Sequence, residues 1–171
     1  FTPNDQTSDY NENQRAYLAL ARAACDVLIE NPEANPTDWK IGGDDLEGNI
    51  VRAAGKHGIT QSTAATDAIA TSIPFSSKHK FSLTRVPDSL IPATWNIGDQ
   101  PHVVLGAPDV LVARSTLSSD EQTRITAAIA AHSNAGRRVL GLAVYNRPAD
   151  SSKPTVEQVT NCQFLGILSF Y

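Results

Sequence analysis

The sequence has no methionine and only two cysteines among its 171 residues. Cys25 and Cys162 lie far apart, and neither belongs to a C-x-x-C pair, so a zinc ribbon or a thioredoxin-like redox motif is not expected. The spacing leaves a disulfide open, but free, buried thiols are the favoured prediction because free cysteine usually behaves as a small apolar residue. The lack of any methionine leads us to expect a fragment or a processed product.

Long apolar runs and an excess of positive charge are also missing. No run approaches the roughly 18–20 apolar residues that span a bilayer. Lysine and arginine number 14 against 18 acidic residues, which gives a formal charge of −4. This balance argues against non-specific nucleic-acid binding, which needs a dense basic surface. With 41% hydrophobic residues, the composition is that of a globular domain long enough to bury a core.

Common catalytic signatures are absent as well. The sequence contains no G-x-S-x-G, H-E-x-x-H or G-x-G-x-x-G pattern. The stretch 48–56 looks like a P-loop, but its glycines are too far apart and His57 stands where Ser or Thr should bind Mg²⁺. The four histidines have no metal-ligand spacing. We therefore expect neither a catalytic residue nor a metal site in this chain, and a stand-alone Ser-His-Asp hydrolase is the least favoured alternative.

The periodicity predicts four helices. Asp44 is a candidate N-cap for the second, and Ser118 with Glu121 forms a capping box for the fourth. The first helix should end at the Asn-Pro pairs that follow residue 30. The expected helices cover about residues 13–30, 46–56, 108–113 and 120–133.

Apolar runs rich in β-formers predict strands, and the proline-rich residues 87–101 are expected to form a loop or an irregular hairpin. The early helices and the mixed short and helical links indicate an α+β fold, with a mainly antiparallel β-sheet and helices packed against it. The expected strands are residues 73–75, 81–86, 102–105, 139–145 and 164–170.

Four short segments are unusual for a plain core. They are Gly43-Asp44-Asp45-Leu46-Glu47-Gly48, Phe75-Ser76-Ser77-Lys78-His79-Lys80, Gly106-Ala107-Pro108-Asp109 and Gly136-Arg137-Arg138-Val139-Leu140. In this order they resemble motifs of the nucleotide-binding (N) domain of P-type cation-transporting ATPases. The family patterns are Gly-(Asp/Glu)-x-x-Glu-(Gly/Ser/Thr), Phe-x-Ser-x-x-Lys, Lys-Gly-Ala-Pro-Glu and Gly-x-Arg-Val-Leu. The resemblance covers about residues 42–171, including the closing strand.

The resemblance implies a nucleotide site. Phe75 would stack on adenine, and Lys80 would contact the base pocket or the phosphates. Glu47 would accept a hydrogen bond from the adenine amino group, and Arg138 would pair with phosphate oxygens. Gly106 would let the backbone approach the ligand without a side chain in the way.

Each of these residues also has an ordinary structural explanation. Phe75 could be a core strand residue, Lys80 and Arg138 solvated surface residues, and Glu47 a first-turn acid favoured by the helix dipole. Asp44, included in the predicted site, is fully explained as an N-cap. Positions 75 and 80 would face opposite sides of a straight strand, so both can reach one ligand only if the backbone turns near Ser76-Ser77.

Two positions depart from the family pattern. Leu105 stands where the family usually has a lysine bordering the nucleotide, and some bacterial members resemble this chain in carrying Leu there. Ser82 stands where other members carry Gln or Met. Both belong to the predicted site, and the lost charge at 105 predicts weaker phosphate attraction. The Phe-x-Ser-x-x-Lys stretch resembles the calcium-, sodium- and proton-pump type rather than the heavy-metal type.

The resemblance implies that residues 1–171 form a single ATP-binding domain, excised from a membrane pump and lying on its cytoplasmic side. It would position ATP for transfer of a phosphoryl group to an aspartate on the phosphorylation domain. Mg²⁺ would arrive with ATP, the other partners would be the phosphorylation and actuator domains, and no membrane contact is expected. The fragment alone should hydrolyse nothing. The alternative is an N-domain-like module with lost or very weak nucleotide affinity that acts in inter-domain contacts.

Overall fold

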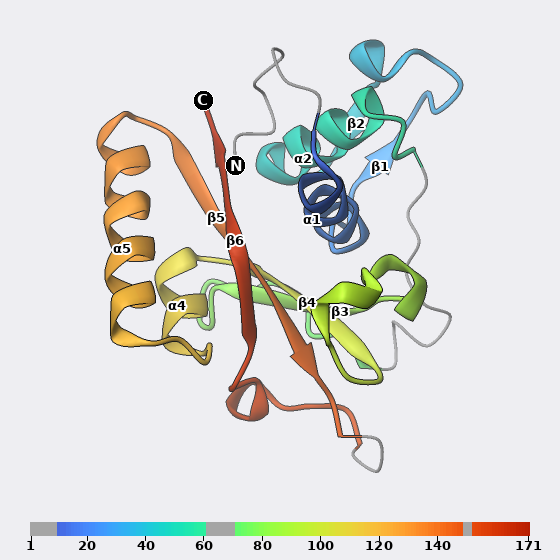
Figure 1. The fold of residues 1–171 in the computed structure, drawn as a ribbon. Coiled ribbons are helices and arrows are strands. Elements are labelled where there is room, and N and C mark those ends of the chain that lie inside the picture. Colours follow the sequence, from blue (N-terminus) through green and yellow to red (C-terminus); the bar gives the residue numbers. More distant parts are fainter. Residues whose placement is uncertain (1–9, 61–70, 149–151) are drawn as a thin grey trace.

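A four-stranded antiparallel sheet lies at the centre of the fold (Figure 1). The computed structural model describes residues 10–60, 71–148 and 152–171. The sheet order is β3-β4-β5-β6, so each strand pairs with its neighbour in the chain. Together with the helices packed on it, this sheet confirms the predicted α+β fold. The strands are β3 (Phe81–Arg85), β4 (Pro101–Gly106), β5 (Arg138–Asn146) and β6 (Gln163–Phe170).

The sheet separates two apolar cores. Alternate residues of a strand face opposite sides, so Val103 and Leu105 of β4 join one core while Val104 joins the other. The first core is completed by α1 and α2, and the second includes Leu111 of α4. Figure 1 shows α1 and α2 together on one side, with α4 and α5 at the left. The helices are α1 (Glu12–Ala23), α2 (Asp45–Lys56), α4 (Pro108–Ala113) and α5 (Ser119–Asn134).

The predicted helix caps are present. The Asp44 side chain accepts hydrogen bonds from the backbone N–H groups of Leu46 and Glu47 at the start of α2. The Ser118 and Glu121 side chains form the reciprocal capping box of α5. Local sequence is sufficient at these two helix starts because the cap satisfies backbone donors within three residues.

The first helix is shorter than predicted. It ends at Ala23, and residues 28–29 form β1 (Leu28–Ile29), which pairs with β2 (Ile41–Gly42). The Asp26 N–H donates to Glu47 of α2 instead of continuing the helix. Leu28, which lies inside the helix predicted over residues 13–30, is 69% exposed. The helix prediction was wrong here because pairing with a distant segment takes over before the Asn-Pro pairs are reached.

The strand predicted over residues 73–75 is also wrong in extent. Only Ile73 pairs, through two backbone hydrogen bonds with Leu83. Pro74 has no N–H to donate, and the chain then turns away. The proline-rich stretch before β4 forms a loop, as expected, with two short 3₁₀ turns. The 3₁₀ turns of the described residues are η1 (Pro36–Asp38), η2 (Asp88–Leu90), η3 (Ala93–Trp95) and η4 (Val156–Gln158).

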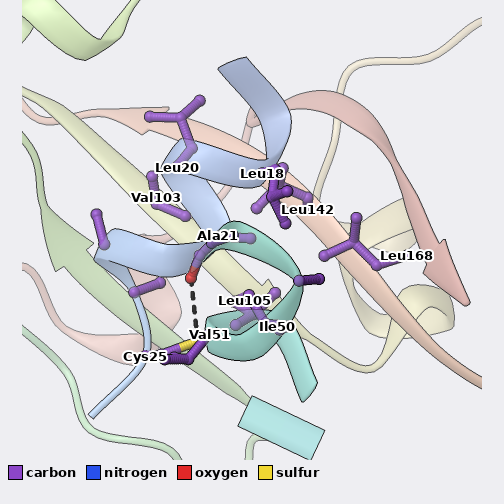
Figure 2. Close-up of a cluster of buried hydrophobic side chains, with 14 of the residues drawn as sticks. Leu18, Leu20, Ala21, Cys25, Ile50, Val51, Val103, Leu105, Leu142 and Leu168 are labelled. Carbon is purple, nitrogen blue, oxygen red and sulfur yellow. Dashed lines mark hydrogen bonds between the residues drawn. The ribbon is translucent and has the colours of Figure 1, made fainter. Parts of the chain in front are cut away.

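Both cysteines are free and buried, which confirms the favoured prediction. The Cys25 thiol donates to the Ala21 carbonyl at 3.2 Å, drawn as a dashed line in Figure 2. Among the residues that the structure describes, no helix has the length and apolar character needed to cross a bilayer.

Candidate functional site

One end of the sheet gathers most of the predicted site residues. In an antiparallel sheet, the start of β3, the end of β4 and the start of β5 lie at the same end. Phe81 pairs with Gly106, and Gly106 pairs with Gly141. Lys80 immediately precedes β3, and Arg138 begins β5, three residues before Gly141. At about 3.3 Å per residue, Arg138 lies roughly 10 Å beyond Gly106 along the strand direction.

Phe75 lies on a surface turn at this end of the sheet. Its side chain is 59% exposed, so it is not a core strand residue. The chain turns at residues 77–79, and the Lys80 N–H donates to the Ser76 carbonyl at 2.7 Å. Lys80 has a left-handed backbone, with φ of 62°. The turn predicted between Phe75 and Lys80 is therefore confirmed, and both side chains remain exposed.

Gly106 lies directly against the backbone at the start of β3. A Cβ atom added there would be 2.3 Å from the Lys80 carbonyl oxygen and 2.6 Å from the Phe81 Cα. The next residue, Ala107, donates its N–H to that same Lys80 carbonyl at 2.9 Å. The glycine thus allows close contact between two segments of the protein, and this contact holds the backbone of Lys80 in place.

Ser82 and Leu105 are buried. They are paired across β3 and β4, and the Ser82 hydroxyl donates to the Leu105 carbonyl at 3.4 Å. Leu105 is only 4% exposed and belongs to the first core. Figure 2 shows its side chain beside Ile50 and Val51 of α2. Apolar packing from α2 therefore covers the position at which the family usually has a lysine.

Glu47 lies on α2 at the margin of that core. Residues three and four positions apart share a helix face, so Glu47 is on the side of α2 that carries Ile50 and Val51. Its Oε2 atom accepts the Asp26 N–H at 2.9 Å. Its Oε1 atom makes no hydrogen bond with the described residues, so it can accept one from a ligand.

Burial raises the pKa of the Glu47 carboxyl above its ordinary value. The hydrogen bond from Asp26 N–H lowers the pKa, and the nearby Asp44 and Asp26 carboxylates raise it again. Asp44 itself uses its Oδ1 atom to cap α2, at 2.9 Å from Leu46 N and 3.1 Å from Glu47 N. Its geometry is that of an N-cap.

The two arginines at the start of β5 differ. The Arg138 side chain is exposed and makes no hydrogen bond or ion pair with the described part of the chain. The guanidinium of Arg137 lies over the Tyr171 ring, 4.1 Å from its centroid, and also donates to the Tyr171 hydroxyl. Arg138 is thus the one of this pair that is available to an anionic ligand.

Comparison with protein families gives one match. The family model described as the P-type ATPase cytoplasmic domain N matches residues 13–171. The chain belongs to the N-domain family of P-type ATPases. No curated protein matches the chain. N domains of this family generally bind nucleotide, and the family comprises ATP-driven hydrolases and translocases.

His79 is a feature of this N domain that the sequence motifs did not single out. Its ring lies 2.9 Å from the Ser76 hydroxyl and 3.0 Å from the Pro74 carbonyl oxygen, so it contacts both chain neighbours of Phe75. It also packs edge-on against the Phe81 ring, with centroids 4.9 Å apart. The three-residue spacing of Ser76 and His79 is the sequence feature that corresponds to this contact.

A cavity of about 280 Å³ lies elsewhere on the N domain. None of the predicted nucleotide residues lines it, although Leu142 is paired with Leu105 on the neighbouring strand. Within residues 10–60, 71–148 and 152–171, no cluster of His, Cys, Asp and Glu could hold a metal ion. The lining residues are Tyr17, Leu142, Leu165, Gly166, Ile167 and Leu168.

Proposed function

We propose that this chain is the ATP-binding domain of a P-type cation pump of the calcium-, sodium- and proton-transporting type. It positions ATP so that the γ-phosphate meets an aspartate on the phosphorylation domain of the same polypeptide. Positioning and electrostatics supply most of the catalysis in phosphoryl transfer, so the domain needs no nucleophile of its own. The isolated chain is therefore inactive as a hydrolase.

One observation carries this proposal. Phe75 is held exposed on a turn beside Lys80, at the sheet end that also carries Gly106, in a chain that belongs to the N-domain family. An exposed aromatic ring is costly to leave in water, and it offers a face on which a base can stack. Lys80 supports the assignment because it is an exposed cationic residue at the end of the same turn.

Glu47 and Arg138 recognise the adenine amino group and the phosphates, respectively. The free Oε1 of Glu47 accepts a hydrogen bond from the adenine amino group, whereas guanine would present a carbonyl to the same acceptor. Arg138 pairs with phosphate oxygens through its planar guanidinium. Mg²⁺ comes with the nucleotide, and the domain lies on the cytoplasmic side of the membrane, against the phosphorylation and actuator domains.

Leu105 favours a second candidate function. A leucine in place of the usual lysine supplies no cation to the expected pocket, and its burial places apolar packing there instead. A domain altered in this way would bind nucleotide very weakly and act mainly in inter-domain contacts. A measurement of ATP affinity separates the two candidates.

The test is a titration of the ¹⁵N-labelled chain with ATP, followed by two-dimensional amide NMR. A millimolar affinity, about −4 kcal/mol, suits this method. We expect saturable shifts near Glu47, Phe75, Lys80, Gly106 and Arg138, weakened in Phe75→Ala and Lys80→Ala. Lys78→Ala is the matched control, since it removes an exposed lysine of the same turn. A well-folded chain without shifts at high ATP would support the inter-domain module.

A further inference from the structure

The turn that carries Phe75 is closed by the backbone hydrogen bond from Lys80 N–H to the Ser76 carbonyl, and one side chain adds two further hydrogen bonds. The His79 ring makes hydrogen bonds on both sides of Phe75, to the Pro74 carbonyl oxygen at 3.0 Å and to the Ser76 hydroxyl at 2.9 Å. Phe75 itself has no regular secondary structure to support it, and its side chain is exposed. The imidazole is therefore the side chain that ties both chain neighbours of Phe75 to the end of the turn.

The hydrogen-bond partners fix the tautomer of His79. A proline carbonyl can only accept, so the Nε2 atom must carry the proton. In the neutral ring the Nδ1 atom then accepts a hydrogen bond from the Ser76 hydroxyl. A neutral, Nε2-protonated ring satisfies both contacts at once.

The ring also connects the turn to the sheet. It packs edge-on against Phe81, the first residue of β3, which is fully buried under the Arg114 guanidinium. Lys80 lies between His79 and Phe81 in the chain, and its carbonyl accepts a hydrogen bond from the Ala107 N–H directly after β4. Phe75 is thus attached through His79 to a rigid part of the fold.

We propose that His79 is a positioning residue for nucleotide binding, which fixes the 74–79 turn so that Phe75 is ready to stack on the base. This inference rests on the proposed ATP-binding function. Ordering a turn and an aromatic side chain on binding costs affinity, and a turn that is already ordered avoids that cost. His79 acts through Phe75 and does not touch the nucleotide.

The experiment compares His79→Ala, Ser76→Ala and the double variant in the 171-residue chain. Each single change should weaken ATP binding about three- to tenfold, which is the range for immobilising a side chain or a turn. The double variant should lose clearly less than the sum of the two single losses, because both changes break the hydrogen bond between the Ser76 and His79 side chains. His132→Ala should leave the affinity unchanged, because this histidine side chain on α5 makes no hydrogen bond with the 74–79 turn.

A second readout does not depend on ATP. Two-bond ¹⁵N–¹H spectra of the free chain should show the Nε2-protonated tautomer of His79. Backbone relaxation should show residues 74–79 ordered in the wild type and mobile in His79→Ala, with the sheet amides unchanged. These results would support the turn linkage even if the wild type failed to bind ATP, which would overturn the proposed function instead.

Two outcomes would overturn the inference about His79. One is a wild type that binds ATP and a His79→Ala variant, mobile in the turn, that binds it equally well. The other is additive losses in the double variant, which would show that His79 and Ser76 contribute independently and not through their shared hydrogen bond.

Discussion

The candidate site consists of two regions that differ in accessibility. The surface turn carries Phe75 and Lys80, both exposed to solvent. The paired strand positions Ser82 and Leu105 are buried, and α1 and α2 cover that face of the sheet. A binding residue must be reachable by its ligand, whereas a buried residue mainly stabilises the fold. Under the proposed function, the exposed turn would make the direct contacts with the nucleotide, and the buried strand positions would support the turn.

The largest expected effect is a loss of stability when a charge is placed at the buried position 105. Leu105→Lys restores the residue usual for the family, but here the ammonium would enter the apolar core beside Ile50 and Val51. We expect a loss of about 3–5 kcal/mol in the free energy of unfolding, the range for an uncompensated buried charge. Urea unfolding measures it, and Leu105→Met, which keeps the volume, should cost less than about 1.5 kcal/mol.

A Leu105→Lys variant as stable as the wild type and with tighter ATP binding would contradict the division into an exposed turn and buried strand positions. Position 105 would then border a pocket open to ligand.

Gly106→Ala should cause the next largest loss of stability. The added Cβ would meet the Lys80 carbonyl oxygen at 2.3 Å, so β4 and the start of β3 would have to separate. Overpacking of this kind costs about 1–3 kcal/mol of stability. Thermal unfolding measures it, and Gly166→Ala is the control because no atom lies within 4 Å of its added Cβ. An unchanged stability in Gly106→Ala would show that this contact is dispensable.

Phe75→Ala should separate binding from stability. Because the ring is 59% exposed, we expect the free energy of unfolding to change by less than about 0.5 kcal/mol. The loss of stacking should weaken ATP binding by about 1–3 kcal/mol. NMR titration and urea unfolding of the same sample measure the two quantities. A large loss of stability with unchanged affinity would assign Phe75 to the core instead of the site.

The smallest expected effect is the contribution of Glu47 to the pH dependence of ATP affinity. Burial raises the pKa of this carboxyl, so it becomes protonated at a higher pH than an ordinary glutamate. A protonated carboxyl is a weaker acceptor for the adenine amino group. ATP affinity should therefore fall as the pH falls through this raised pKa. Glu47→Gln still offers an acceptor but does not titrate, so its affinity should lack this component. Equal pH profiles for the two proteins would remove Glu47 from the site.

The same carboxyl has an opposite effect on stability. Since its pKa is higher in the folded state, the folded chain binds more protons just above the ordinary value of 4.5. Its contribution to the free energy of unfolding therefore decreases as the pH rises through that interval. The difference between wild-type and Glu47→Gln unfolding curves across this pH range isolates that contribution.

Much of the fold was predictable because the signals were local. The caps at Asp44 and Ser118 act within one helical turn, and the helix over residues 108–113 has its expected bounds. The end of α1 was not predictable, because Asp26 bonds to Glu47 twenty-one residues away. For the site, the sequence motifs indicated the residues and the turn near Ser76, but not the contacts of His79.

By itself, the sequence determined the α+β class, most helix starts, and four motifs whose order indicated the family. These features depend on hydrophobic spacing and on residue types close together in the chain. Only the tertiary structure decided which candidate residues are accessible. Leu105 is buried because α2 packs over its strand, and Phe75 is exposed because a turn held by His79 directs it away from the sheet. Burial depends on which distant segments come together, and local spacing does not contain that information.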